Sequence, residues 1–353
     1  ILWDSTCPSK IRSRLVTWED KRCDRTFLEE LKNMTGYEVH SGMGIATLAW
    51  IQRHKPSEFR KYDRAGTIMD YFASLMVDLS SDQMPCMDFT NAASWGCFDL
   101  KRNEFDSNAT SMLDLDHLLP SLRPSGACLG HLCKDWASRT GVSTGTAVGV
   151  AMGDCACVVQ GAISSIEKDI CVTFGTSSQI AIVVPRNEGL SSSFETQTEL
   201  RPYFDADFML VGASLNGGNV LEETARGMQR ICRGLGCTPP PDLESTYKIL
   251  DRASRSVTVK SSSSIRVDPR YHGERHLSAC RGGSIGNITS RESFDVGQIW
   301  YTTCCALLEN LKNMLPGHVL TTRKRVLCVG GAFESCATLA KAVREVFGFV
   351  KVE

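Results

Sequence analysis

The sequence has no excess of charge of either sign. Its 353 residues include 39 Lys and Arg against 40 Asp and Glu, which gives a formal net charge of −1 at pH 7. Because a protein that binds polyanions through its overall field carries a clear positive balance, this class is excluded as the default interpretation. We therefore expect no nucleic acid among its partners, unless a local basic patch provides a separate surface.

Long hydrophobic runs are absent as well. No window of about 18 residues stays apolar, so no membrane-spanning helix is predicted and we expect no membrane partner. The opening Ile-Leu-Trp-Asp-Ser contains no basic segment leading into an apolar run, which argues against a signal peptide there. The 16 cysteines are scattered, and the chain is too long to need a disulfide framework. We expect reduced thiols in a cytoplasmic protein.

Two nucleotide-binding motifs and one metal-binding motif are missing. The sequence contains neither Gly-x4-Gly-Lys-Ser/Thr nor a Gly-x-Gly-x-x-Gly string after a strand, which disfavours P-loop nucleotidases and dinucleotide enzymes. His272 and His276 are four residues apart, but Gly273 between them opposes a helix and no third ligand is nearby in the sequence. We predict no metal ligands among the side chains.

What the sequence does contain is typical of a globular protein. Hydrophobic residues make up 42% and charged residues 22%, and the length suggests roughly two domains. Helical spacing and short β-type runs alternate, which predicts an α/β or α+β core with a boundary near residues 145–160. The predicted helices span 27–34, 46–52, 65–79, 219–235, 300–315 and 336–347, and the predicted strands 147–152, 170–174, 180–184, 208–213 and 326–329. Residues 83–108 are predicted to be loop with short strands, and residues 251–289 an extended surface excursion.

Asp154 follows an apolar run, residues 147–153, that we interpret as a strand. A carboxylate at a strand end, with Gly153 leaving room beside it, suits the role of a general base toward a substrate hydroxyl. The alternative is an aspartate that caps the next helix by accepting backbone N–H bonds. Spacing alone favours the capping alternative.

Glycine-rich turns follow two of the predicted strands. Gly175, Thr176 and Ser177 form one of them, and such a turn offers backbone N–H groups and hydroxyls to a phosphate. The alternative is a plain hairpin to the next strand, which these residues alone favour. Gly330 and Gly331 carry the same ambiguity, because tight strand-to-helix turns use glycine with or without a ligand.

Residues 17–23 place an aromatic ring beside acidic and basic side chains. Trp18, Asp20 and Arg22 suit the recognition of a polyol, since carboxylate and guanidinium groups bind neighbouring hydroxyls and an indole ring covers the apolar face of a sugar. The alternative is an exposed helix start.

These strings occur in the order found in the FGGY family of carbohydrate kinases, and the sequence resembles that family over nearly its whole length. Each string alone is weak evidence for the resemblance, whereas the whole set in this order is strong evidence for it. The matching segments are 17–23, 35–36, 65–71, 91–99, 118–120, 153–154, 213–221 and 273–276. The resemblance implies an α/β fold of two ribonuclease-H-like (actin-like ATPase) domains, with ATP and sugar meeting in the cleft between them. We accordingly predict a sugar-binding domain at 1–160 and a nucleotide-binding domain at 161–353.

The resemblance also implies roles for individual residues. Asp154 matches the family's catalytic base, which takes the proton of the terminal sugar hydroxyl as that oxygen attacks the γ-phosphorus of ATP. ATP and Mg²⁺ are the implied cofactors. The other implied contacts are those of Gly175, Thr176 and Ser177 with phosphate, Gly217 with the nucleotide, Gly330 and Gly331 with adenosine, and Trp18, Asp20 and Arg22 with the sugar.

The substrate prediction rests on part of this resemblance. Residues 15–18, 91–98, 213–221 and 273–277 are most similar to family members that act on a seven-carbon ketose. We therefore predict ATP-dependent phosphorylation of sedoheptulose to sedoheptulose 7-phosphate. The alternatives are a family member that acts on xylulose, ribulose or glycerol, a non-catalytic sugar-binding remnant, or an actin-like structural ATPase.

The sequence departs from the family pattern at both ends. The family's opening Asp-x-Gly-Thr phosphate hairpin, its Met-His-Gly segment and its final Asp-rich turn and helix have no counterpart here. We therefore expect an incomplete first domain, a second domain without its last turn and helix, and a chain that is part of a longer protein. Cys155 and Cys157 also stand where the family more often has small or amide residues, which alters the surroundings of the base.

Overall fold

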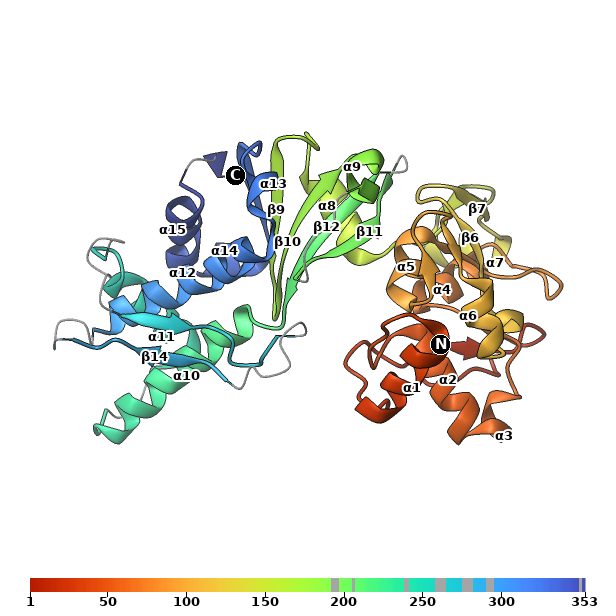
Figure 1. Cartoon of the computed structure of the whole chain (residues 1–353), viewed down its shortest axis with the longest axis horizontal. Coiled ribbons are helices and arrows are strands. Elements are labelled where there is room, and N and C mark those ends of the chain that lie inside the picture. The colour runs from red at the N-terminus through yellow and green to blue at the C-terminus, as the bar shows by residue number, and fades with distance from the viewer. Residues whose placement is uncertain are drawn as a thin grey trace. The chain divides into compact units, whose positions relative to one another are not determined.

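The computed structural model describes residues 1–191, 197–204, 207–237, 241–257, 265–274, 282–289, 295–348 and 351–352. The chain forms two compact units, which can be followed by colour in Figure 1. Unit 1 comprises Ile1–Cys157 and Arg201–Phe208, and unit 2 comprises Val158–Leu200 and Met209–Glu353. The domains predicted from the sequence are contiguous, whereas the segment 201–208 belongs with unit 1.

Unit 1 is built from short helices and small two-stranded sheets. β1 pairs with β2, β4 with β5 and β7 with β8 in antiparallel fashion, and β3 runs parallel to β6. The helix α8 (Asp154–Ala162) begins in unit 1 and continues into unit 2. The other elements of unit 1 are β1 (Leu2–Trp3), α1 (Arg25–Thr35), α2 (Gly44–His54), α3 (Pro56–Phe59), β2 (Arg64–Ala65), α4 (Ile68–Met76), β3 (Cys86–Asp88), α5 (Phe89–Trp95), β4 (Phe98–Asp99), β5 (Glu104–Phe105), α6 (Ser107–Met112), the 3₁₀ turn η1 (Asp116–Leu118), β6 (Ser121–Arg123), β7 (Cys128–His131), α7 (Lys134–Thr140) and β8 (Ala147–Gly149).

Local capping chemistry sets the bounds of the helices in unit 1. α1 begins where the side chain of Asp24 accepts the N–H of Phe27, and it ends at Gly36, whose φ of 77° lies in the left-handed region that favours glycine. α4 begins with a reciprocal capping box, in which Thr67 and Asp70 each accept the backbone N–H of the other. The sequence therefore encodes these helix starts through short polar side chains.

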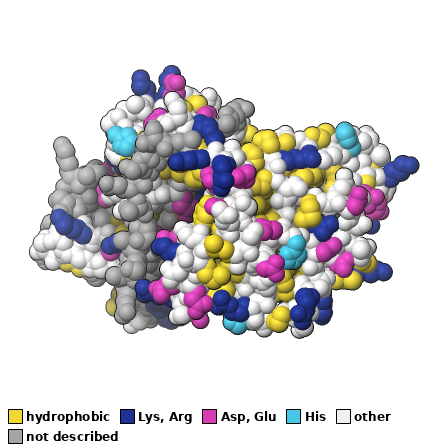
Figure 2. All heavy atoms as spheres, turned by 45° about the vertical axis from the view of Figure 1, so that its right-hand side comes forward, with side chains coloured by type: hydrophobic (Ala, Val, Ile, Leu, Met, Phe, Trp, Pro, Cys, Tyr) yellow, Lys and Arg dark blue, Asp and Glu magenta, His cyan; other side chains and the backbone are white. Residues whose placement is uncertain are grey.

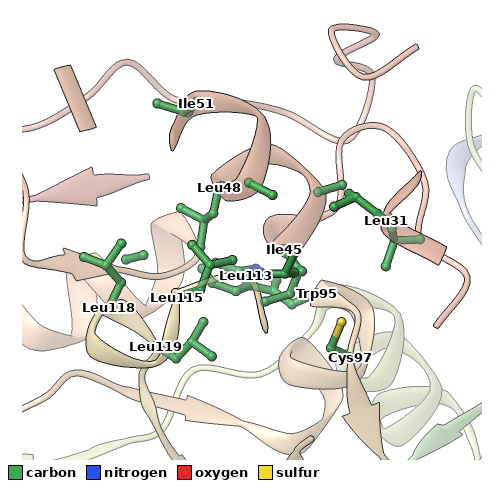
Figure 3. Close-up of a cluster of buried hydrophobic side chains, with 14 of the residues drawn as sticks. Leu31, Ile45, Leu48, Ile51, Trp95, Cys97, Leu113, Leu115, Leu118 and Leu119 are labelled. Carbon is green, nitrogen blue, oxygen red and sulfur yellow. The ribbon is translucent and has the colours of Figure 1, made fainter. Parts of the chain in front are cut away.

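The core of unit 1 gathers α1, α2, α5 and the 113–119 segment. Figure 3 shows the side chains of these elements pointing toward one another. Ile45 is fully buried, and Gly44 lies so close to the indole of Trp95 that a Cβ there would be 2.2 Å from its Cδ2. The labelled members of this core are Leu31, Ile45, Leu48, Ile51, Trp95, Cys97, Leu113, Leu115, Leu118 and Leu119.

Unit 2 is organised around a six-stranded sheet with the order β11-β12-β10-β9-β15-β16. β9 and β10 form an antiparallel hairpin, while β15 runs parallel to both β9 and β16. α12 packs against β10 and α15 (Figure 1). The elements are β9 (Asp169–Phe174), β10 (Ser178–Val184), α9 (Arg186–Ser191), β11 (Glu199–Pro202), β12 (Phe208–Ser214), α10 (Gly218–Gly234), α11 (Leu243–Ala253), β13 (Arg266–Asp268), β14 (Ser284–Gly286), α12 (Val296–Met314), α13 (Gly317–Leu320), β15 (Arg325–Val329), α14 (Gly331–Ser335), α15 (Ala337–Val346) and β16 (Lys351–Val352).

Most of the predicted elements are confirmed to within a few residues, but three predictions differ from the structure in part. The strand predicted at 147–152 is only β8, three mostly exposed residues. The loop with short strands predicted at 83–108 does contain the short strands β3, β4 and β5, but it also contains the helix α5, capped by Asp88, and the first residues of α6. The extended excursion predicted at 251–289 is confirmed in part by the short strands β13 and β14, but the side chain of Glu274 within it is only 5% exposed. Residues 258–264 and 275–281, which include His276, lie outside the described residues.

The surface and the helices agree with the composition. On the face shown in Figure 2, Lys and Arg side chains lie beside Asp and Glu side chains, in keeping with the near-zero net charge. Among the described helices, none combines the length and the apolar character needed to cross a bilayer.

Candidate active site

The glycine-rich turn between β9 and β10 is joined to the start of α10. Gly175, Thr176 and Ser177 form this turn, as the hairpin alternative predicted. The N–H of Gly218 donates to the carbonyl oxygen of Gly175 at 2.8 Å, and the N–H of Asn219 donates to that of Thr176 at 3.1 Å. The turn and the first residues of α10 therefore form one hydrogen-bonded assembly.

Close backbone contact explains the glycines of this assembly. A Cβ on Gly217 would lie 2.6 Å from the carbonyl carbon of Ser177, so no larger residue fits without a shift of the backbone. Gly330 has a φ of 121°, and a Cβ there would lie 2.3 Å from the carbonyl oxygen of Phe174. Gly331 follows as the first residue of α14.

The sheet brings the two glycine-rich turns to one edge. β9 and β15 are parallel, with Thr173 opposite Val329, so both strands end at the same level. Ligands of open α/β sheets bind outside the carboxyl ends of the strands. The structure thus places together all six residues predicted to contact the nucleotide, namely Gly175, Thr176, Ser177, Gly217, Gly330 and Gly331.

The tip of the turn offers polar groups that the protein itself leaves unused. The first amides of α10 are occupied, because those of Gly218 and Asn219 bond to the turn and that of Val220 bonds to the Asn219 side chain. Within the described part of the chain, the hydroxyls and backbone N–H groups of Thr176 and Ser177 have no hydrogen-bond partner. These groups can serve an anion such as a phosphate.

A buried carboxylate holds the segment that leads into α10. Glu274 accepts hydrogen bonds from the hydroxyl of Ser214 at 2.5 Å, from Nδ2 of Asn310 at 2.8 Å and from Nδ2 of Asn216 at 3.1 Å. Asn216 also donates to the carbonyl oxygen of Gly273 at 2.9 Å. Since Asn216 immediately precedes Gly217, this cluster holds in place the segment that contacts the 175–177 turn.

Asp154 lies in unit 1 at the first residue of α8, and its side chain is exposed. Its carboxylate accepts the N–H of Cys155 at 2.7 Å. The capping alternative predicted a bond of this kind, from a backbone N–H at the start of the helix. The second carboxylate oxygen, however, has no partner among the described residues. The side chain is therefore available to a substrate hydroxyl.

The backbone just before Asp154 is held by the start of α5. The N–H of Gly153 donates to Oγ1 of Thr90 at 2.9 Å, and Nδ2 of Asn91 donates to the carbonyl oxygen of Ala151 at 3.0 Å. Asp88, which is fully buried, accepts the hydroxyl of Thr90 at 2.7 Å. We call Asp88, Thr90 and Asn91 the α5 bracket.

The residues predicted for the sugar share one loop of unit 1. Arg22 and Asp20 form a two-bond ion pair, with Nε–Oδ1 at 2.8 Å and Nη2–Oδ2 at 2.9 Å. The bond from this guanidinium holds the pKa of Asp20 below its ordinary value. Arg22 also stacks over the ring of Trp50 at 5.3 Å, while Trp18 is 60% exposed. An exposed indole beside a charged pair agrees with polyol recognition.

The two groups of predicted residues in unit 1 are not bonded to each other. In the described part of unit 1, neither Asp20 nor Arg22 makes a hydrogen bond or ion pair with Asp154. Sequence reasoning missed the α5 bracket and the carboxylate of Glu274. The capping pattern of an aspartate three residues before Asn91 was the available signal for the bracket, whereas nothing in the sequence marks Glu274 as buried.

Comparison with known proteins gives these arrangements a context. The model for the N-terminal domain of the FGGY family of carbohydrate kinases matches residues 1–161. Sedoheptulokinase of Mus musculus is 30% identical over 345 residues, which are 96% of this chain and 69% of that protein. Sedoheptulokinase of Homo sapiens is 29% identical over 343 residues, covering 95% and 68%.

A solved structure supports the fold. The xylulose kinase from Rhodospirillum rubrum superposes with a TM-score of 0.71 at 18% identity, over 90% of this chain and 61% of that one. This likeness confirms the predicted α/β, actin-like fold class. The chain spans about two thirds of the length of these relatives. Its identity and coverage with the mouse protein show that the chain belongs to the FGGY family of carbohydrate kinases.

Proposed function

We propose that this protein transfers the γ-phosphoryl group of ATP to the terminal hydroxyl of a ketose, converting sedoheptulose to sedoheptulose 7-phosphate. Unit 1 binds the sugar and carries the base, and unit 2 binds the nucleotide. The observation that carries the proposal is the assembly of the 175–177 turn, the start of α10 and Gly330 at one edge of the unit 2 sheet.

The nucleotide part of the proposal follows from the groups at that edge. A triphosphate needs hydrogen-bond donors that are fixed and unoccupied, and Thr176 and Ser177 provide both N–H groups and hydroxyls. The bare backbone at Gly217 and Gly330 lets these residues lie directly against Ser177 and Phe174, which holds the two turns in place. Because phosphoryl transfer depends mainly on positioning and charge neutralisation, the rigidity of this turn is the property that matters.

Asp154 is the proposed general base. Its exposed carboxylate accepts the proton of the attacking sugar hydroxyl while the oxygen forms its bond to the γ-phosphorus and ADP leaves. General bases of this kind contribute about 10²–10⁴ in rate. The free second oxygen of Asp154 is what makes this step chemically open to it.

Mg²⁺ fits this arrangement as a partner of the phosphates. The described residues contain no group of three or more His, Cys, Asp or Glu that could hold a metal, and Mg²⁺ in kinases is carried largely by substrate phosphates and water. Thr176 and Ser177 would hold the phosphates that carry the ion. When bound, the ion neutralises charge on the phosphates.

The choice of sugar rests on the relatives and on the loop of Trp18. Two of the most similar proteins are sedoheptulokinases, whereas the similarity to a xylulose kinase of Bacillus subtilis is 24% identity over 76% of this chain. Trp18, Asp20 and Arg22 are proposed to contact the ketose. A cytoplasmic location stays a prediction.

A panel of acceptors tests the proposal directly. The chain is incubated with Mg-ATP and sedoheptulose, xylulose, ribulose or glycerol, and ADP release and phosphorylated product are measured. We expect the highest kcat/KM with sedoheptulose. Turnover of xylulose but not of sedoheptulose would refute the substrate assignment. Absence of ATP binding by calorimetry would favour the non-catalytic remnant.

A further inference from the structure

The α5 bracket is the feature of unit 1 that the proposed reaction does not yet use. It reaches across 60 or more residues of sequence to the backbone just before Asp154, since the Asn91–Ala151 bond has a sequence separation of 60 and the Thr90–Gly153 bond one of 63. Long-range bonds of this kind fix tertiary position, because no local secondary structure requires them.

The hydrogen-bond directions in the bracket are determined by its donors. A threonine hydroxyl has one proton, and Thr90 gives it to Oδ2 of Asp88 at 2.7 Å. The lone pairs of Thr90 Oγ1 are thereby turned toward the N–H of Gly153, which donates to it at 2.9 Å. Asp88 is held in turn by the N–H of Asn91 at 2.9 Å and the hydroxyl of Ser125 at 2.7 Å.

Gly153 permits this close contact. A Cβ at that position would lie 3.1 Å from Oγ1 of Thr90, which is tighter than side chains normally allow. The bracket is also dry, since Asp88, Thr90 and Asn91 are 0%, 4% and 5% exposed. Buried hydrogen bonds of this type are lost only at the cost of an unsatisfied group, so the segment 151–153 has one preferred position.

We propose that Thr90 and Asn91, oriented by Asp88, are positioning residues that set the place of the Asp154 carboxylate through the backbone of residues 151–153. The inference rests on the proposed role of Asp154 as the base. Misplacement of a catalytic group by about 1 Å can lower a rate by about 10²-fold, which gives the bracket a kinetic consequence.

The test compares Thr90→Val, which removes the hydroxyl at nearly constant volume, with Thr90→Ser, which retains it. We expect Thr90→Val to lower kcat by about 10- to 100-fold with the KM values for ATP and sugar within about two-fold, and Thr90→Ser to restore most of the rate. Thr47→Val is the matched control, because Thr47 is also buried in a helix of unit 1 but its hydroxyl has no partner.

Two further measurements separate positioning from folding. In an Asp154→Asn background, Thr90→Val should cause no additional loss of kcat if Thr90 acts through Asp154. Hydrogen exchange followed by mass spectrometry should show faster exchange of residues 151–155 in Thr90→Val and unchanged exchange of α1 and α2. If Thr90→Val does not fold, Gly153→Ala tests the same contact from the other side, with the same expected changes.

The proposal is overturned if Thr90→Val folds with wild-type kcat, or if its loss persists in full in the Asp154→Asn background, or if exchange at 151–155 is unchanged. Its failure is distinguishable from failure of the proposed function. A wild-type kcat in Asp154→Asn would refute the proposed role of Asp154 as the base. A strong loss of kcat in Asp154→Asn together with a wild-type kcat in Thr90→Val would refute only the positioning role of the α5 bracket.

Discussion

The two regions proposed to carry catalysis are held in place by different means. In unit 2, the 175–177 turn and the start of α10 are joined by backbone hydrogen bonds, and glycines at 217 and 330 allow neighbouring backbone segments to lie in direct contact. In unit 1, the backbone before Asp154 is held by side-chain hydroxyl and amide groups of the α5 bracket. The arrangement in unit 2 therefore requires glycine at particular positions, whereas the arrangement in unit 1 requires particular polar side chains.

The largest effect is expected at Asp154, the proposed general base. Asp154→Asn retains the size of the side chain and removes its basicity, so kcat should fall by about 10²–10⁴. Dissociation constants for ATP and sugar, measured by calorimetry, should change little because the carboxylate is exposed and lightly bonded. A comparable loss of binding would give Asp154 a structural role instead.

The next effect probes the backbone-held region. Gly330→Ala places a methyl 2.3 Å from the carbonyl oxygen of Phe174 at a φ of 121°, and we expect a loss of about 2–4 kcal/mol in unfolding free energy together with weaker ATP binding. Gly227→Ala in α10 is the control, because nothing lies within 4 Å of its Cβ. That change should stabilise by about 0.5–1 kcal/mol, as measured by urea denaturation. Equal effects of the two would contradict the close-contact argument.

Glu274→Gln tests whether unit 2 also depends on one side-chain cluster. Oε1 of Glu274 accepts from Ser214, Asn216 and Asn310, and the N–H of Leu215 donates to Oε2 at 3.3 Å, so the amide nitrogen of a glutamine must face at least one N–H group and the change should cost about 1–3 kcal/mol. ATP affinity should weaken through the shift of Gly217. Glu223→Gln, at an exposed position of α10, is the control and should leave both calorimetric affinity and stability unchanged. An unaltered Kd for ATP in Glu274→Gln would show that the turn holds itself.

A pH-dependent effect contrasts two buried carboxylates of unit 1. Asp88 has both oxygens bonded, whereas Oδ1 of Asp70 has no partner and burial raises the pKa of Asp70 to about 7. The folded state therefore holds this proton more tightly than the unfolded chain does. Stability from Asp70 is fully present below about pH 4 and declines as the pH rises toward 7, by at most about 1.4 kcal/mol per pH unit.

Asp70→Asn should remove this decline. The quantity to measure is the unfolding free energy of the wild type minus that of Asp70→Asn across this pH range. A difference that stays constant with pH would show that Asp70 is ionised in the folded protein.

The sequence predicted best what glycine and apolar spacing encode. The hairpin of Gly175, the turn at Gly330 and the long helices α10 and α12 were found because backbone requirements leave a direct trace in residue type. β8 was predicted too long because the apolar run continues beyond the three residues that form the strand, and Val150, the first residue after it, is buried without being part of it.

Side-chain networks were not predictable in the same way. Thr90 and Gly153 are brought together by tertiary packing, and their own sequence neighbours give no sign of it. Glu274 lies in a polar stretch that looks solvent-exposed, yet its donors come from β12, the loop after it and α12. Burial of a charged residue depends on partners far away in the chain, which composition does not reveal.

The contact of Gly330 with the end of β9 has an evolutionary consequence. A Cβ at residue 330 would occupy the space of the Phe174 carbonyl group, so neither strand end can change its backbone course or gain bulk there alone. Because the contact is to the backbone of residue 174, this contact itself does not restrict the side chain at that position, whereas a lineage that lost Gly330 should carry a remodelled hairpin to match.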